Sequence, residues 1–169
     1  PLYVTTKIEP SSTKLWSINF DSPLTDNLEI DTQKLKDLYE GVEARYTQYL
    51  ENTLEINQVL RKDTDLAACT LYLLANECQL AHPISLAVHS QIPVGRGLGS
   101  SGALIVAILK HSANNQEKLL KLCSKIENFQ HGVSSGLDPH TSLTRSMIIK
   151  KGHKIYEAQL PKRFWQTFT

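Results

Sequence analysis

The segment from Pro93 to Ala103 combines four glycines and two serines in the order Pro-Val-Gly-Arg-Gly-Leu-Gly-Ser-Ser-Gly-Ala. Glycines allow a backbone to approach an anion closely and to adopt positive φ angles. Where such a loop leads into a helix, the free amides and the helix dipole favour phosphate. The two serine hydroxyls are suited to phosphate oxygens or to Mg²⁺. The sequence therefore predicts a phosphate-binding loop.

Two better-known glycine loops do not fit this segment. A Walker A loop ends in Gly-Lys followed by Ser or Thr, and this loop contains no lysine. The spacing of Gly97, Gly99 and Gly102 matches Gly-x-Gly-x-x-Gly, but a dinucleotide-binding fold requires a second strand ending in an acid about twenty residues later. Residues 116–125 are helical in pattern and rich in lysine. Both alternatives are rejected.

A second group of reactive residues, Glu127, His131, Ser135 and Asp138, follows downstream. Two carboxylates can divide the work of phosphoryl transfer, since one holds a metal ion and the other accepts the proton of the substrate hydroxyl. Taken singly, Glu127 is typical of a solvated helix acid, Asp138 of a turn and His131 of a helix end. Their joint spacing after the glycine loop favours the catalytic interpretation.

Both segments resemble those of the GHMP-type small-molecule kinases. The loop is similar to the family motif P-x-G-x-G-L-G-S-S-A/G-A, and the second segment resembles the E-x-x-x-H-G-x-x-S-G-[IVL]-D pattern of mevalonate kinases. The positions that fill the first motif are Pro93, Gly95, Gly97, Leu98, Gly99, Ser100, Ser101, Gly102 and Ala103.

The resemblance implies an enzyme that uses ATP and Mg²⁺ to phosphorylate a small alcohol, with mevalonate as the expected substrate. Residues Pro93 to Gly102 of the first motif would bind the ATP phosphates. Ser101, or Ser100 in its place, would hold Mg²⁺ together with Glu127. Asp138 would be the catalytic base, and His131 and Ser135 would contact the substrate. Phosphomevalonate kinase, homoserine kinase and a non-catalytic GHMP-fold ligand-binding protein remain as alternatives, and so does an anion-binding domain outside the family.

The sequence also departs from the family pattern. A Pro-Gly-Lys segment that begins family members and their C-terminal domain have no counterpart in residues 1–169. Arg96 is bulkier than the usual loop residue, and 141–146 lacks the usual glycines. We therefore expect residues 1–169 to form a single domain, a partial GHMP N-terminal ATP- and substrate-binding domain. Its expected protein partner is a second copy or a C-terminal GHMP domain.

Hydrophobic periodicity predicts the elements that position these residues. Strands are expected at 3–8 and 14–20, paired as a hairpin, and at 84–92, directly before the glycine loop. The expected helices span 31 to about 60, with a break near Gly41 or 51–53, then 64–82, 102–111 and 116–130. We expect a loop at 131–139 and a closing hairpin at 147–150 and 154–160.

This order of elements predicts an α+β fold. The family resemblance implies a ribosomal-protein-like two-layer domain, in which helices cover one face of a mostly antiparallel sheet.

Composition narrows the class of partner. The 18 basic and 17 acidic residues give a net charge of +1, which offers no electrostatic basis for nucleic acid or membrane binding. The three cysteines, at 69, 78 and 123, form no Cys-x-x-Cys pair, so neither a disulfide framework nor a zinc site is expected. A reducing, cytoplasmic location is predicted. No apolar run is long enough to span a bilayer.

Overall fold

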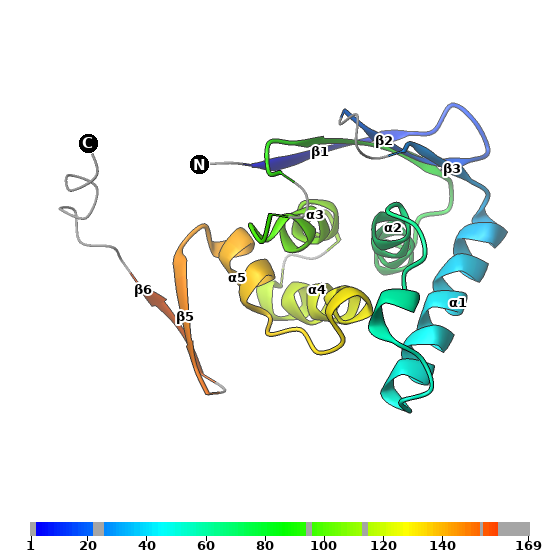
Figure 1. The fold of residues 1–169 in the computed structure, drawn as a ribbon. Coiled ribbons are helices and arrows are strands. Elements are labelled where there is room, and N and C mark those ends of the chain that lie inside the picture. The colour runs from blue at the N-terminus through cyan, green and yellow to red at the C-terminus, as the bar shows by residue number, and fades with distance from the viewer. Residues whose placement is uncertain (1–2, 22–25, 94–95, 113–114, 153, 159–169) are drawn as a thin grey trace.

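A computed structural model describes residues 3–21, 26–93, 96–112, 115–152 and 154–158 of this chain. Its main sheet has four strands in the order β1-β4-β2-β3, and the helices lie together on one side of that sheet (Figure 1). This arrangement confirms the predicted α+β fold with helices on one face. The strands are β1 Val4–Pro10, β2 Trp16–Phe20, β3 Leu28–Ile30 and β4 Ile84–Ser90.

Strand β4 occupies the interior of the sheet. It pairs antiparallel with β1, where Thr6 lies opposite Val88, and parallel with β2, where Ile18 lies opposite Leu86. Strand β3 pairs antiparallel with the outer edge of β2. The predicted hairpin between the first two strands is therefore wrong, because β4 lies between them. Alternation in the sequence indicates which side chains share a face of a strand, but not which strand is its neighbour.

The helices build the core beneath the sheet. Helices α2 and α3 are buried along most of their length, and they pack with α4 against the inward side chains of β2 and β4. Fully buried residues from five elements meet here, namely Ile18, Leu71, Leu86, Ile108 and Phe129. The helical segments are α1 Thr32–Leu50, the 3₁₀ turn η1 Ile56–Gln58, α2 Asp65–Glu77, α3 Ser100–Leu109, α4 Gln116–His131 and α5 Leu137–Thr144.

Helix α1 begins and ends for local reasons. The side chain of Asp31 accepts a hydrogen bond of 2.8 Å from the amide of Lys34, so Asp31 is the N-cap residue. The helix continues through Gly41 and ends at Leu50, so the sequence-based prediction of one helix reaching residue 60 is too long. Of the two predicted break points, the structure uses the polar one at 51–53.

The predicted loop at 131–139 ends earlier than expected, because helix α5 begins at Leu137. Gly136 precedes the helix with a φ of +72°, and Pro139 lies in its first turn. A proline is tolerated there because the amide it removes has no partner within the helix. Asp138 is therefore a helical residue and not a loop residue.

Strands β5 Met147–Lys151 and β6 Lys154–Ala158 form the predicted closing hairpin, with Gly152 at its turn. The predicted end at Leu160 lies outside the described residues. This hairpin is a separate two-stranded sheet that contacts α5 and projects away from the main helices (Figure 1).

In the part of the chain that the structure describes, no helix has the length and apolar character required to cross a membrane.

Candidate active site

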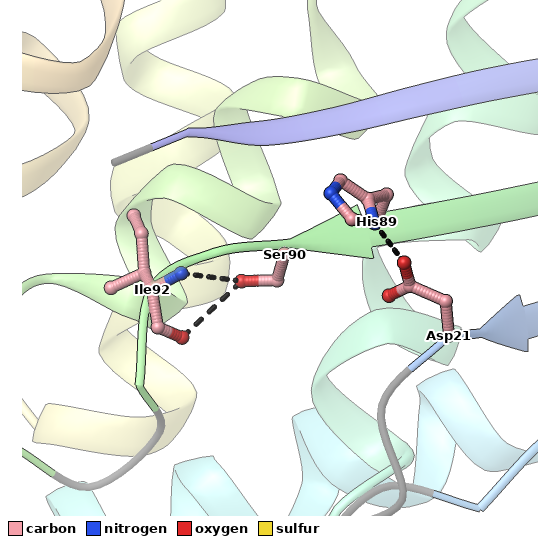
Figure 2. A network of polar contacts seen from close by, with 4 residues as sticks. All are labelled: Asp21, His89, Ser90 and Ile92. Carbon is pink, nitrogen blue, oxygen red and sulfur yellow. Dashed lines mark hydrogen bonds and ion pairs between the residues drawn. The ribbon is translucent and has the colours of Figure 1, made fainter. Parts of the chain in front are cut away.

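The glycine loop leaves the end of β4 through a turn that Ser90 shapes. The Ser90 hydroxyl donates to the carbonyl of Ile92 at 3.3 Å and accepts from the amide of Ile92 at 3.2 Å. Figure 2 shows both bonds, and on the neighbouring strand end it shows the side chain of Asp21 facing His89. Such local bonds between a serine and the backbone two residues later favour a turn over a continued strand. The chain is thereby directed out of the sheet toward Pro93.

The described part of the loop has the backbone that phosphate binding requires. Gly97 and Gly99 have φ angles of +69° and +68°, which residues with a side chain rarely adopt. Gly99 is the N-cap residue of α3 and has no side chain with which to occupy the first amides of that helix. Those amides stay available to an anion. Ser100 and Ser101 form the first turn of α3 and are partly exposed.

Both predicted carboxylates lie against the start of α3. A Cβ atom built on Gly102 would lie 2.7 Å from the Cβ of Asp138 and 3.0 Å from Oε1 of Glu127. A Cβ built on Gly99 would lie 3.2 Å from Cγ of Asp138. Segments that are separated in sequence therefore meet around Gly102, and a glycine there leaves room for the two acids.

Glu127 is a buried acid, with 3% of its surface exposed. Burial raises the pKa of its carboxyl above the ordinary value, and the negative charge of Asp138 acts in the same direction. The Ser134 hydroxyl, which donates to Oε2 of Glu127, and the nearby His131 lower that pKa in part. Perturbed acids of this kind are concentrated at functional sites. Asp138, by contrast, is exposed in the first turn of α5, where its carboxylate is accessible to a substrate.

The other two predicted residues lie at the end of α4 and in the loop that follows it. His131 is the exposed last residue of α4. The hydroxyl of Ser135 accepts from the amide of Leu137 at 3.3 Å, and the ammonium of Lys150 on β5 donates to the Ser135 carbonyl at 2.8 Å. Ser135 is exposed and its contacts are with the backbone and with β5, so its role toward a substrate stays a prediction.

A cavity of about 560 Å³ adjoins the glycine loop and the start of α3. One wall belongs to the segment between α1 and α2, from Ile56 to Asp63, which sequence reasoning did not select. Hydrogen bonds to both flanking helices fix that segment: Arg45 of α1 donates to the carbonyl of Val59 at 2.8 Å, and Asp65 of α2 accepts from the amide of Arg61 at 2.8 Å. The other lining residues include Ile92, Pro93, Ser100, Ser101, Leu104 and Phe129. Mixed apolar and polar walls of this size are typical of small-molecule sites.

The acidic and hydroxyl side chains at this site indicate which metal ion it could bind. No cluster of three or more His, Cys, Asp or Glu side chains occurs among the described residues, so they contain no complete protein cage for a cation. Mg²⁺ is usually held by one or two carboxylates and by substrate phosphates. A buried Glu127 next to the serines of a phosphate loop is consistent with that pattern.

The predicted residues therefore divide into groups. The structure brings together Gly99, Gly102, Glu127 and Asp138. Ser100 and Ser101 lie at the same helix end. Gly95 lies outside the described residues. Pro93 lines the cavity, and Leu98 is 56% exposed. Ser134 was missed, since the motif leaves its position unspecified, although a hydroxyl seven residues from a predicted acid was a usable signal.

Comparison with known proteins supports the resemblance. Residues 65–145 match the family model described as "GHMP kinases N terminal domain". The mevalonate kinase of Pyrococcus abyssi is 37% identical over 85 residues, which cover 47% of this chain and 25% of that protein. The mevalonate kinase of Pyrococcus horikoshii is 38% identical over 77 residues, 42% of this chain and 23% of that protein. The matched segment thus spans about a quarter of these relatives.

Solved structures extend the similarity in fold to nearly the whole chain. A crystal structure of a mevalonate kinase superimposes with a TM-score of 0.71 at 17% identity, over 94% of this chain and 47% of that one. The Methanococcus jannaschii mevalonate kinase gives a TM-score of 0.69 at 17% identity, with the same coverage. At this identity the likeness concerns the fold alone, and the chain spans about half the length of these structures.

Proposed function

We propose that this chain forms the ATP- and substrate-binding part of a kinase whose acceptor is mevalonate, because residues 65–145 match the family model of the GHMP kinase N-terminal domain. One observation carries the proposal above all: two carboxylates from separate helices, Glu127 and Asp138, converge on Gly102 in the first turn of the helix that follows the glycine loop. Phosphoryl transfer requires such groups close to a phosphate site.

In this proposal the phosphates of ATP lie at the start of α3. The amides of the first turn and the hydroxyls of Ser100 and Ser101 hold the phosphate oxygens, while Gly97 and Gly99 allow the backbone to adopt the required conformation. The cavity between the glycine loop and residues 56–63 takes the nucleoside, because it adjoins both serines and its lining includes the apolar side chains of Leu104 and Phe129.

Glu127 and Ser101 would hold Mg²⁺, which supplies charge neutralisation on the phosphates. Asp138 accepts the proton of the acceptor hydroxyl as that oxygen attacks the γ-phosphorus, and the bond from the γ-phosphorus to the bridging oxygen of the β-phosphate breaks to release ADP. His131 and Ser135 border the space that the acceptor enters. The protein's main contributions are positioning of the two reactants and electrostatic stabilisation of the transferred group.

Mevalonate is favoured as the acceptor because the curated relatives that this chain matches are named mevalonate kinases. We would measure ADP release by the complete polypeptide with MgATP, offering mevalonate, phosphomevalonate and homoserine in parallel. Turnover with mevalonate is expected. Nucleotide binding without turnover on any of the three acceptors would instead favour a non-catalytic ligand-binding protein.

The assignment of the base has its own test. Asp138→Asn should lower kcat by about 10²–10⁴-fold, because the amide cannot accept the hydroxyl proton. ATP affinity should change little, which equilibrium binding of a fluorescent nucleotide would check. A variant with wild-type turnover would show that Asp138 is not the base.

A further inference from the structure

The hydroxyl of Ser134 joins the two segments that carry the carboxylates. It donates a hydrogen bond to Oε2 of Glu127, near the end of α4, and accepts one of 3.0 Å from the amide of Gly136, the N-cap residue of α5. The amide of Ser134 itself donates to Oδ1 of Asn128 at 2.7 Å. These three bonds connect the last turns of α4, through Ser134, to Gly136, which lies two residues before Asp138.

The bond to Ser134 also determines how the Glu127 carboxylate is oriented. With Oε2 engaged by the hydroxyl, Oε1 is the oxygen that approaches α3, 3.0 Å from a Cβ position built on Gly102. Gly102 directly follows Ser101 in the chain. Without Ser134, a buried carboxylate would lose one hydrogen-bond donor, and its side chain would be free to rotate away from the helix start.

We propose that Ser134 is a positioning residue that holds Glu127 in the orientation needed for metal binding. The same residue keeps the Glu127 carboxylate at a fixed position relative to Asp138. The inference rests on the proposed function, since it assumes that Glu127 binds a divalent cation. Groups that hydrogen-bond to metal ligands fix the orientation of those ligands, and their loss typically weakens metal affinity or activity by roughly 10–100-fold.

Substitutions of Ser134 should differ in effect, because they keep or remove different hydrogen bonds. Ser134→Ala removes the donor to Glu127 and the acceptor for the Gly136 amide at once. Ser134→Thr keeps the hydroxyl, and Ser134→Cys keeps a similar size with a weaker donor. Ser12→Ala, in an exposed turn far along the chain from both segments, is the matched control for the loss of a serine hydroxyl.

The experiment measures Mn²⁺ binding to the complete polypeptide by electron paramagnetic resonance, in the presence of a non-hydrolysable ATP analogue. Ser134→Ala should weaken Mn²⁺ binding about tenfold, Ser134→Thr should stay within about twofold of the unmodified protein, and Ser134→Cys should lie between them. Steady-state kinetics should agree: the Mg²⁺ concentration for half-maximal rate rises, while KM for the acceptor stays unchanged.

Glu127→Gln separates this inference from the function on which it depends. If Glu127→Gln weakens Mn²⁺ binding and Ser134→Ala does not, Glu127 is a ligand but Ser134 does not position it, and the inference is wrong. If Glu127→Gln leaves Mn²⁺ affinity unchanged, the proposed metal role fails and the inference fails with it. Should Ser134→Ala not fold, Ser134→Cys takes its place, and a Mn²⁺ affinity equal to that of the unmodified protein would overturn the inference.

Discussion

Glu127 is an acid in an environment that disfavours its charge. Burial is the main reason that its pKa is raised, and the hydrogen bond from Ser134 offsets only part of that effect. A carboxyl whose pKa is higher in the folded protein than in the unfolded chain favours folding when it is protonated. That benefit is present at low pH and is lost as pH rises through the folded-state pKa. At neutral pH the ionised carboxylate therefore weakens the fold of the ligand-free protein.

Because ionisation of Glu127 weakens the fold, a prediction follows for Glu127→Gln, which keeps an acceptor for Ser134 but carries no charge. The variant should gain stability relative to the unmodified protein as pH rises above the ordinary pKa of 4.5 and through the raised pKa. Urea unfolding of the ligand-free protein, repeated from about pH 4 to about pH 8, measures the difference.

An exposed acid supplies the control for that pH series. Glu117 pairs with Lys121 at 2.7 Å, and its hydrogen bond with that lysine lowers its pKa. Glu117→Gln should therefore lose a little stability, and the loss should be present above pH 4.5 and should disappear at lower pH. A difference for Glu127→Gln that stayed constant across the series would contradict the account of its burial.

At the scale of elements, the end of α4 is fixed against α1. Gly132 follows α4 with a φ of +77°, and its carbonyl accepts a hydrogen bond of 2.7 Å from the hydroxyl of Tyr46. A Cβ atom built on Gly132 would come closer to the hydroxyl oxygen of Tyr49 than any side chain tolerates, and it would lie 2.8 Å from Cζ of the same ring. The position of the loop that carries Ser134 thus depends on close packing between a glycine and two tyrosines of α1.

Gly132→Ala should accordingly lower the free energy of unfolding by more than the backbone cost alone. That backbone cost is at least roughly 1–2 kcal/mol, the value for the left-handed helical region, because Gly132 has a ψ of −69° and lies outside that region. Forced overpacking typically adds about 1–3 kcal/mol. Gly152→Ala is the matched control, because Gly152 has a φ of +62° and no atom within 4 Å of a built Cβ. Equal losses in the two variants, measured by chemical denaturation, would show that contact with Tyr49 is unimportant.

The helices and strands also show which parts of the fold the sequence could predict. The order and approximate limits of most helices and strands followed from periodicity, and so did the placement of the glycine loop between β4 and α3. The partner of β1 did not follow, since its alternation is equally compatible with β2 and β4. Helix α5 was missed because Gly136 and Pro139 are typical of a loop, although a proline in a first turn is compatible with a helix.

The same distinction applies to the site. The motif selected Glu127 and Asp138 by type and spacing, and the structure brings both to Gly102. Ser134 escaped notice because its importance comes from a hydrogen bond across a tight loop, and such a bond depends on backbone angles that the spacing of residues does not specify. The cavity wall at 56–63 lies far from both motifs in sequence, so only the tertiary fold relates it to them.

Across the whole molecule, the core and the β5–β6 hairpin differ in how they are held. The four-stranded sheet shares one apolar core with α1, α2, α3 and α4. The hairpin packs against α5, and its apolar residues are largely exposed, with Met147 at 40%, Ile149 at 49% and Tyr156 at 48% of their surface. Segments with few buried apolar contacts open at a lower cost than the core.

Native-state hydrogen exchange should therefore separate the two parts. Amides in the β5–β6 ladder are expected to exchange through local opening, well before the amides that join β1 to β4, whose exchange should approach the global unfolding free energy. Mass spectrometry of peptic fragments would resolve both regions. Equal protection in the two ladders would mean that the hairpin unfolds only with the core.

The central position of β4 has a consequence for the order of events during synthesis. Ser17 and Ser85 are hydrogen-bonded neighbours in the finished sheet, but 68 residues separate them along the chain. At a translation rate of about 5–20 residues per second, β2 leaves the ribosome on the order of several seconds before its neighbour exists. During that interval its edge has to remain unpaired or covered by α1 and α2. Because the glycine loop directly follows β4, the arrival of one strand both closes the sheet and presents the phosphate loop.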